Sequence, residues 1–171
     1  MQENKMSYDC CFTHDNNWFR YRVGAIIIED DCVLFVKNNI DDYYYSVGGG
    51  VHMNEEAQDA IVREVYEETG VKYEIDHLAV IHENFFSQNS SSLKGLTCHE
   101  ISLYYLMKSR GTKKLNSNSY NSFGAKEEMC FLPLDKLEDY TVYPSFIKDN
   151  LQQIKDGIVH IITRDNKNYI V

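Results

Sequence analysis

The stretch GGGVHMNEEAQDAIVREVYEETGV, from Gly48 to Val71, constrains the fold more than any other, because a glycine run leads directly into a helical pattern. The spacing of its apolar residues predicts a helix from about Asn54 to Thr69. Asn54 suits the N-cap position, and Gly70 suits the position after the last helical residue. We therefore expect a tight turn followed by a helix whose apolar side is covered by the rest of the chain.

The second half of this helix carries carboxylates on its apolar side. At about 100° per residue, Glu64, Glu67 and Glu68 fall on the same side as the apolar stripe. That stripe consists of Ala57, Ala60, Ile61 and Val65. Like charges at this spacing repel each other, and the C-terminal end of a helix is itself partly negative. The pattern therefore predicts that something offsets the repulsion.

A divalent cation would offset it, since Mg²⁺ and Mn²⁺ prefer oxygen ligands. The glycine run fits this interpretation, because glycine lets main-chain groups approach an anion or a metal closely at the start of a helix. The alternative is a solvated acidic face, which is what most charge runs are. The helical wheel disfavours that alternative, because desolvated carboxylates without a partner are costly.

Patterns outside this stretch predict strands on both sides of the helix. The predicted strands cover residues 19–28, 32–37, 41–47, 78–86, 99–108 and 157–165, and residues 129–137 are predicted as a strand leading into a turn. A second helix is predicted from Pro144 to about residue 155. The polar segments 87–97 and 109–128 are predicted as loops, and the length of the second is typical of a functional or a disordered segment. This order predicts an α/β fold, with a mixed β-sheet and helices packed against it, in a single domain of residues 1–171.

Composition excludes several classes of function. The net charge of −9 disfavours binding to a nucleic-acid polymer or to an acidic membrane surface. No apolar run is long enough to span a bilayer, and the first residues lack the pattern of a signal peptide. The five cysteines lack zinc-like spacing and are interpreted as reduced thiols. We therefore expect a cytoplasmic protein.

The glycine–helix stretch resembles the signature of the Nudix hydrolases (MutT-like proteins), G-x5-E-x7-R-E-U-x-E-E-x-G-U, in which U is a bulky aliphatic residue. All nine specified positions are matched, by Gly49, Glu55, Arg63, Glu64, Val65, Glu67, Glu68, Gly70 and Val71. The order of the flanking strands is also similar to the α/β/α sandwich of that family. The resemblance covers most of the chain, and least clearly its first fifteen residues.

The resemblance implies hydrolysis of a nucleoside diphosphate linked to another group, with Mg²⁺ or Mn²⁺ as cofactor. Glu64, Glu67 and Glu68 would be the metal ligands, with the main-chain carbonyl of Gly48 as a further ligand. Glu55 and Arg63 would support the geometry of the loop and helix. The family commonly has Pro-Gly-Gly before the helix, whereas this chain has Val47-Gly48-Gly49-Gly50 without the proline.

Four residues outside the signature are candidates for substrate binding. Many members of the family add an acidic residue from a later loop as a ligand or base, and Glu127 and Glu128 are the candidates here. A charged loop end is the alternative for both. Arg20 and Arg22, on an early strand, are candidates for contact with phosphate, and the alternative for each is a surface arginine.

The sequence does not select one substrate. ADP-ribose, a nucleotide sugar or a nucleoside triphosphate each fit the resemblance, and a homodimer is possible because relatives are often dimers. Aromatic residues suitable for stacking on a base, or alternatively for the core, are Tyr43, Tyr44, Tyr45, Phe85, Phe86, Tyr104 and Tyr105. His99 and Glu100 are a further candidate contact. A nucleotide sensor without catalysis and a structural Ca²⁺ site are the alternative functions, although the acids do not have EF-hand spacing.

Overall fold

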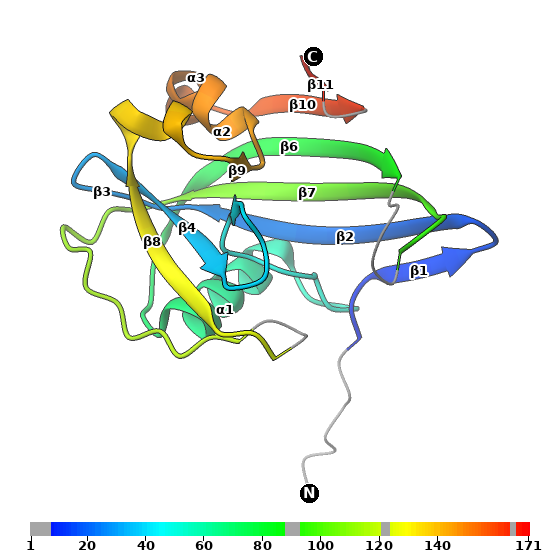
Figure 1. Ribbon diagram of the computed structural model, residues 1–171, viewed down its shortest axis with the longest axis horizontal. Helices are drawn as coiled ribbons and strands as arrows, with labels where there is room; N and C mark the ends of the chain where they lie inside the picture. The colour runs from blue at the N-terminus through cyan, green and yellow to red at the C-terminus, as the bar shows by residue number, and fades with distance from the viewer. Residues whose placement is uncertain (1–7, 88–92, 121–123, 165–166) are drawn as a thin grey trace, which may run out of the picture.

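A computed structural model describes residues 8–87, 93–120, 124–164 and 167–171. Its main sheet has six strands, and parallel and antiparallel pairs coexist in it (Figure 1). In spatial order these are β1 (Cys11–His14), β2 (Asn17–Ile26), β7 (Thr97–Met107), β6 (Ile75–Ser87), β10 (Val159–Arg164) and β11 (Lys167–Ile170). The pairs β2–β7 and β10–β6 are parallel, and the other pairs are antiparallel. The predicted mixed sheet is therefore confirmed.

A second, smaller sheet is formed by short strands around β4. Its strands are β3 (Ile28–Glu29), β4 (Cys32–Asn38), β5 (Tyr44–Tyr45) and β9 (Val142–Tyr143), with β8 (Glu127–Pro133) paired to β4. The single mixed sheet that we expected is thus divided in two. The division falls at Ile27, between β2 and β3, so that one predicted strand over residues 19–28 contributes to both sheets.

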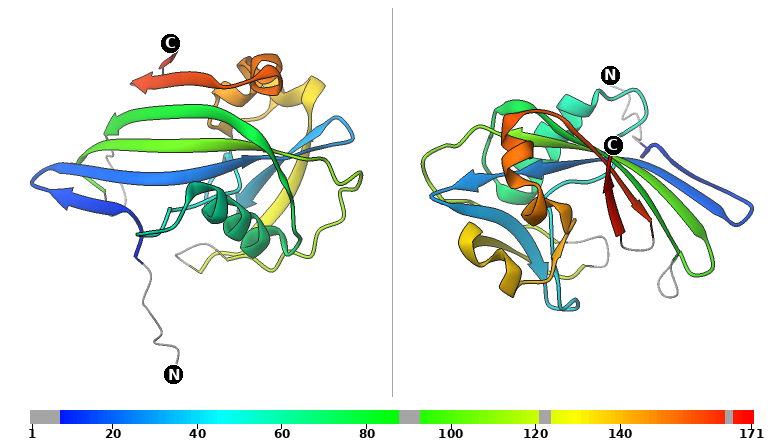
Figure 2. Two further views of the ribbon diagram at one scale, coloured as in Figure 1. Left: turned by 180° about the vertical axis from the view of Figure 1, so that it is seen from behind. Right: turned by 90° about the horizontal axis from the view of Figure 1, so that it is seen from above.

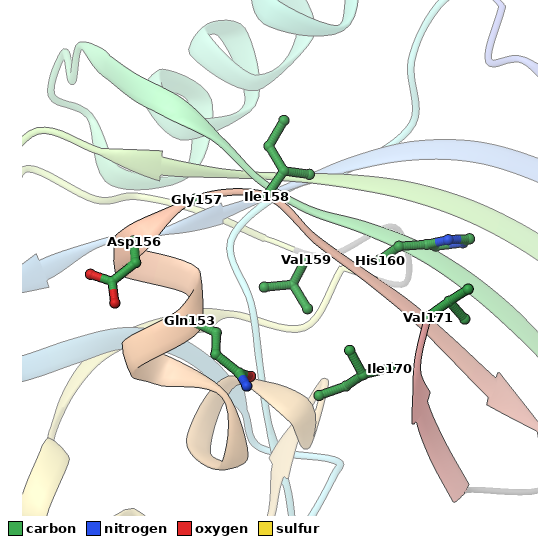
Figure 3. Close-up of a pocket in the computed structure, with 8 residues that line it drawn as sticks. All are labelled: Gln153, Asp156, Gly157, Ile158, Val159, His160, Ile170 and Val171. Atoms are coloured by element: carbon green, nitrogen blue, oxygen red, sulfur yellow. The ribbon is translucent and has the colours of Figure 1, made fainter.

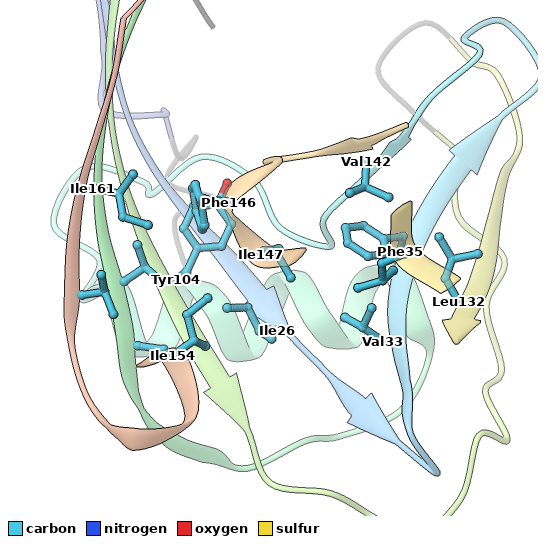
Figure 4. Close-up of a cluster of buried hydrophobic side chains, with 14 residues drawn as sticks. Ile26, Val33, Phe35, Tyr104, Leu132, Val142, Phe146, Ile147, Ile154 and Ile161 are labelled. Carbon is cyan, nitrogen blue, oxygen red and sulfur yellow. The ribbon is translucent and has the colours of Figure 1, made fainter. Parts of the chain in front are cut away.

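Helices cover both sides of the main sheet, which confirms the α/β/α sandwich. The helix α1 (Ala57–Thr69) lies on one side, while α2 (Phe146–Asp149) and α3 (Leu151–Asp156) lie on the other (Figure 2). Each side has its own hydrophobic cluster. Ala60, Ile61 and Val65 of α1 pack with Val23 and other β2 residues in one cluster. The other cluster joins Phe146, Ile147 and Ile154 to Tyr104 and Phe35 (Figure 4).

The start of α1 corrects the sequence prediction. The helix begins at Ala57 rather than near Asn54, and its N-cap is Glu56 without a side-chain capping bond. Asn54 instead has a φ of 65° in the preceding turn, a left-handed conformation that asparagine tolerates. Glu55 is also held outside the helix, because its carboxylate accepts a hydrogen bond from the amide of His52 at 2.9 Å. The end is as predicted, with Gly70 as the C-cap at a φ of 70°.

The helix predicted near the C-terminal end is divided. Residues 146–149 and 151–156 are separate helices because Asn150 interrupts them with φ −123° and ψ 18°. The side-chain amide of Asn150 donates to the carbonyl of Phe146 at 3.0 Å, a local bond that competes with regular helix geometry. Pro144 lies before the first of the two helices rather than inside it.

Three strands were not predicted, namely β1, β9 and β11, and β9 has only two residues. All four residues of β1 are exposed, so it lacks the alternation of apolar residues that identifies a half-buried strand. β11, paired with β10, is also mostly exposed. Conversely, β6 and β7 are longer than predicted and pair along nearly their whole length. The predicted loop over residues 87–97 lies partly outside the described residues.

Residues 109–120, from the long polar segment, lie among the described residues, and we call them the strap. The first residues of the strap are bound to Glu29 of β3. The carboxylate of Glu29 accepts hydrogen bonds from Ser109 Oγ at 2.7 Å and from the amides of Arg110 and Gly111 at 2.7 and 3.0 Å. These bonds outweigh the effect of burial and lower the pKa of Glu29. Along the described parts of the chain, no helix is long and apolar enough to cross a membrane.

Candidate active site

The glycine turn lies directly against the acidic side of α1. The amides of Val23 and Ala25 in β2 donate to the carbonyls of Gly49 and Val47, each at 2.9 Å, so the turn is fixed to the main sheet. A Cβ on Gly49 would lie 2.6 Å from the carboxylate of Glu64, which is closer than side-chain atoms can approach. A side chain at this position would displace the Glu64 carboxylate, so glycine preserves the position of that acid next to the turn.

Arg63 connects the turn, the helix and the residue before the helix. Its guanidinium donates to both carboxylate oxygens of Glu55 at 2.8 Å, to Glu64 Oε1 at 2.5 Å and to the carbonyl of Gly50 at 3.1 Å. The hydrogen bonds from Arg63 lower the pKa of Glu55 to about 2. The structure thus brings Glu55, Arg63 and Glu64 together, in contacts suited to the supporting role expected for Glu55 and Arg63.

Glu68 lies between the helix and the glycine turn. One carboxylate oxygen, Oε1, accepts a hydrogen bond from the amide of Gly48 at 2.9 Å. The other, Oε2, is buried and has no hydrogen-bond partner among the described residues. Burial raises the pKa of Glu68 to about 8, and the negative charges of Glu127 and Glu64 add to the increase. A carboxylate in this position requires either a proton or a nearby cation.

Glu67 departs from the position expected on the helical wheel. Its side chain is 58% exposed, and its Oε2 lies 3.5 Å from Arg63 Nη1. Glu67 therefore lies at the edge of the apolar stripe and does not share the buried side of the helix with Ala60 and Val65. It remains next to Glu64 and Glu68 in sequence and on the same end of the helix.

The donor set fits a divalent cation, although its side chains do not converge on one point. Within the described residues, no three Asp, Glu, His or Cys side chains are already arranged to hold a metal ion. The buried, unpartnered Oε2 of Glu68 is nevertheless the kind of oxygen that a hard cation binds. The carbonyl of Gly48 also accepts no hydrogen bond among the described residues, whereas its neighbours Val47 and Gly49 do.

The two acids at the start of β8 differ in their surroundings. Glu127 is buried, with an exposed fraction of 8%, and its charge acts on Glu68. Its Oε1 accepts a hydrogen bond from the hydroxyl of Tyr45 at 2.6 Å, and its Oε2 accepts one from Ser119 Oγ. Glu128 is exposed instead, because successive residues of a strand point to opposite faces. The structure therefore brings Glu127, and not Glu128, toward the acidic helix.

Arg22 and Arg20 lie on β2 beside this acidic group. Burial alone would lower the pKa of Arg22, but the charges of Glu100, Glu68 and Glu64 raise it, so the guanidinium is a stable cation. Its Nε is buried without a hydrogen-bond partner among the described residues. Arg20 donates to Glu100 at 2.9 and 2.5 Å, and its guanidinium lies 5.3 Å from the ring centre of Trp18. Burial disfavours the charge of Glu100, yet the two arginines keep its pKa below the ordinary value.

Two of the seven aromatic candidates belong to the buried core, and Tyr44 and Tyr45 pack against it. Tyr104 and Tyr105 are buried, with exposed fractions of 3% and 4%. Phe85 stacks on His99 at 4.3 Å between ring centres, and Phe19 lies edge-on to the same imidazole at 5.6 Å. Tyr45 was identified from the sequence only as a possible stacking residue. Its contact with Glu127, 82 residues away, has no sequence signal.

A hollow of about 390 Å³ lies away from the acids, between α3, β10 and β11 (Figure 3). Its lining includes Gln153, Asp156, His160 and Val171, none of which contacts the glycine turn. The candidate site is therefore defined by the chemistry of α1 and the arginines, and this hollow is not part of it.

Comparison with known proteins identifies the family of the chain. A model of the NUDIX domain family matches residues 18–150, which is well over half of the chain, so this chain belongs to the NUDIX family. Diphosphoinositol polyphosphate phosphohydrolase 2 of Mus musculus is 34% identical over 93 residues, which cover 52% of each chain. Diphosphoinositol polyphosphate phosphohydrolase 3-alpha of Homo sapiens is 35% identical over 75 residues, 42% of this chain and 46% of that protein. The chain thus spans about half the length of these curated relatives.

Solved structures with a similar fold are more distant in sequence. A MutT NUDIX hydrolase from Burkholderia pseudomallei has a TM-score of 0.60 and 22% identity, covering 79% of this chain and 97% of that one. The dihydroneopterin triphosphate pyrophosphohydrolase of E. coli has a TM-score of 0.57 and 18% identity, covering 81% and 95%. These likenesses establish the fold, which is the α/β/α sandwich expected from the sequence.

Proposed function

We propose that this chain is a pyrophosphohydrolase that uses a divalent cation, Mg²⁺ or Mn²⁺, to cleave the diphosphate linkage of a nucleotide-type small molecule. The observation that carries the proposal is Glu68, whose Oε2 is buried without a partner among the described residues, beside Glu64 and Glu127. A carboxylate that is both desolvated and near like charges is destabilised unless a cation accompanies it. Membership of the NUDIX family supports the same function.

In this proposal, Glu64, Glu67 and Glu68 hold the cation together with the carbonyl of Gly48. The bound cation supplies charge neutralisation at the phosphate oxygens and lowers the pKa of a coordinated water. Arg63 and Glu55 hold Glu64 and the glycine turn in place through the bonds described above. Glu64 and Glu67 are the helix acids next to Glu68 that can accept the proton of the attacking water.

Arg22 is the proposed contact for a substrate phosphate. Its guanidinium is held near Glu64, Glu68 and Glu100, and its Nε has no partner among the described residues. The fixed charge of Arg22, together with the bound cation, would offset the carboxylates around it, and a chain with a net charge of −9 needs such local positive charge to attract an anionic substrate. Arg20 is a second, weaker candidate because Glu100 already occupies its guanidinium.

The proposed substrates are a nucleoside diphosphate linked to another group, of the ADP-ribose or nucleotide-sugar type, or a nucleoside triphosphate. The curated relatives add diphosphoinositol polyphosphates to the compounds to be compared, because that is what their names state. A cytoplasmic location and a possible homodimer remain predictions.

The experiment is a panel of these compounds with Mg²⁺, followed by phosphate release and product analysis, for the natural chain and for Glu67→Gln. We expect cation-dependent hydrolysis of at least one compound by the natural chain and a loss of orders of magnitude in the variant. A nucleotide sensor without catalysis is the second candidate. Equal nucleotide binding by both proteins, with no turnover in either, would favour the sensor and overturn the hydrolase.

A further inference from the structure

Residues 8–10, which precede β1, lie against the glycine turn, and we call them segment 8–10. The amide of Cys10 donates to the carbonyl of Val51 at 2.7 Å, which joins the segment to the residue after the glycines. A Cβ on Gly50 would lie 2.4 Å from Asp9 Oδ2, so the carboxyl group of Asp9 lies directly against that glycine. The NUDIX family model matches residues 18–150, so segment 8–10 lies outside the part of the chain that identifies the family.

The imidazole of His52 lies between two carboxylates. Its Nε2 is 3.6 Å from Asp9 Oδ1, and its Nδ1 is 3.6 Å from Glu55 Oε2. These distances are too long for hydrogen bonds, but they allow ion pairs when the imidazole is protonated. The main chain joins the same residues, because Asp9 and His52 form an antiparallel bridge and the amide of His52 donates to Glu55 Oε2 at 2.9 Å. His52 therefore connects segment 8–10 to Glu55 through its ring and through its backbone.

The contacts continue from Glu55 into α1. Arg63 donates to both oxygens of Glu55 at 2.8 Å and to Glu64 Oε1 at 2.5 Å. Five residues thus form one row of alternating charge in which each side chain contacts the next, and we call it the charge row: Asp9, His52, Glu55, Arg63 and Glu64. A change at its first two members would alter the orientation of the Glu55 carboxylate and, through Arg63, the position of Glu64.

We propose that Asp9 and His52 are positioning residues of the active site, which hold the Glu55 carboxylate and thereby Arg63 and Glu64. The inference rests on the proposed function and extends the site to a segment outside the family match. The charged groups around the imidazole are Asp9 from segment 8–10, Glu55 from the turn before α1 and, beyond Glu55, Arg63 from α1. The charge row is strongest when His52 is protonated, because the imidazole then lies between two negative charges.

The test compares two Asp–His pairs of the full chain. His14 Nε2 lies 3.7 Å from Asp15 Oδ2 in a second such pair, which is exposed in the turn between β1 and β2. Asp9→Asn and His52→Gln should each lower kcat by about 2- to 5-fold with the best substrate of the panel, the size expected for partly exposed ion pairs. KM should stay unchanged, because neither residue is a proposed substrate contact. Asp15→Asn and His14→Gln are the matched controls and should change neither quantity.

The dependence on pH separates positioning from a general structural effect. The ratio of kcat for the natural chain to kcat for His52→Gln should be larger at about pH 5.5 than at about pH 8, because histidine side chains change charge in this range. The corresponding ratio for His14→Gln should not change. Natural kcat in both Asp9→Asn and His52→Gln would overturn the positioning role, and so would a loss in His52→Gln that is the same at both pH values.

A double-mutant cycle tests the charge row without relying on catalysis. In denaturant unfolding, the loss of stability in Asp9→Asn/Glu55→Gln should differ from the sum of the two single losses, because His52 contacts both carboxylates. The losses in Asp15→Asn/Glu55→Gln should add. Additive losses in the first cycle would overturn the charge row. A natural chain that hydrolyses none of the compounds would overturn the proposed function instead, which is a different result.

Discussion

Two regions of this molecule supply the candidate site, and their contacts span very different distances along the chain. Around the glycine turn and α1, Arg63 binds Glu55 and Gly50, which are 8 and 13 residues away. Around the strap and β8, the partners are 49 residues apart for Ser117 and Glu68, and 82 residues apart for Tyr45 and Glu127. The first region is built from one continuous segment, and the second exists only after segments far apart in the sequence have come together.

Because of this difference, substitutions in the two regions should affect the site in different ways. Contacts within one segment form as soon as the helix forms, so changes there should alter the site chemistry or the stability of the helix directly. Contacts between distant segments depend on the loop that carries them, since their loop-closure entropy must be offset by the rest of the fold. Four experiments, taken from the largest expected effect to the smallest, test whether the two regions differ in this way.

Glu68→Gln should reduce activity by orders of magnitude while leaving the fold intact. Glutamine keeps an oxygen that can accept the amide of Gly48 but removes the charge that binds the cation. Without metal, the melting temperature should be unchanged or slightly raised, because repulsion from Glu64 and Glu127 is removed. Full activity in this variant, measured with the best substrate of the panel, would contradict the ligand assignment.

Arg63→Ala should have the largest effect on stability in the first region. The substitution leaves Glu55, Glu64 and the carbonyl of Gly50 without their shared donor, and hydrogen bonds to charged groups contribute about 1.5–3 kcal/mol. Denaturant unfolding measures the change. Lys108→Ala is the control, since its ion pair with Glu74 is exposed and should contribute less than about 1 kcal/mol. Equal losses would show that the Arg63 contacts are no stronger than a surface pair.

Acid should weaken the same region through Glu55. Because Arg63 lowers the pKa of Glu55 from 4.5 to about 2, the stabilisation is complete above pH 4.5 and is lost as the pH falls toward 2. The free energy of unfolding of the natural chain should therefore decrease more steeply over this range than that of Glu55→Gln. Unfolding curves at a series of pH values measure both slopes, and parallel slopes would refute the assignment.

Gly70→Ala should report on the contact between α1 and the strap. Gly70 and Gly111 both have a φ of 70°, so alanine has a similar backbone cost at each. At Gly70, however, the added Cβ would lie 2.1 Å from the carbonyl oxygen of Asn116, whereas nothing lies within 4 Å at Gly111. Gly70→Ala should be less stable than Gly111→Ala by about 1 kcal/mol in thermal unfolding. Equal stability of the two variants would mean that the strap moves away from the added methyl group without an energetic cost.

The sequence was sufficient for the family, the α/β/α architecture and the order of most strands. The glycine turn, Arg63 and the acids of α1 lie in one segment, so their spacing alone predicts which of them meet. Even there, the exposure of Glu67 and the left-handed turn at Asn54 were missed, because helical periodicity does not state where a helix begins or how far solvent reaches along it. Whether the acids bind metal stays a prediction.

The second region was not predictable in the same way. Glu127 and Glu128 are equivalent as sequence neighbours, and only the register of β8 against β4 determines which side chain is buried. The contact between Tyr45 and Glu127 requires β5 and β8 both to pair with β4 in the smaller sheet, and no local pattern indicates it. β1 was not predicted for a related reason, because an exposed strand carries no hydrophobic alternation.

The position of Trp18 has a practical consequence. It is the only tryptophan in the sequence, and its ring lies next to the guanidinium of Arg20, which in turn binds Glu100. The fluorescence of an indole responds to the charge beside it, so the chain contains its own optical reporter. A ligand that pulls Arg20 away from the ring would change the emission of a single fluorophore, and its binding would be visible without any label.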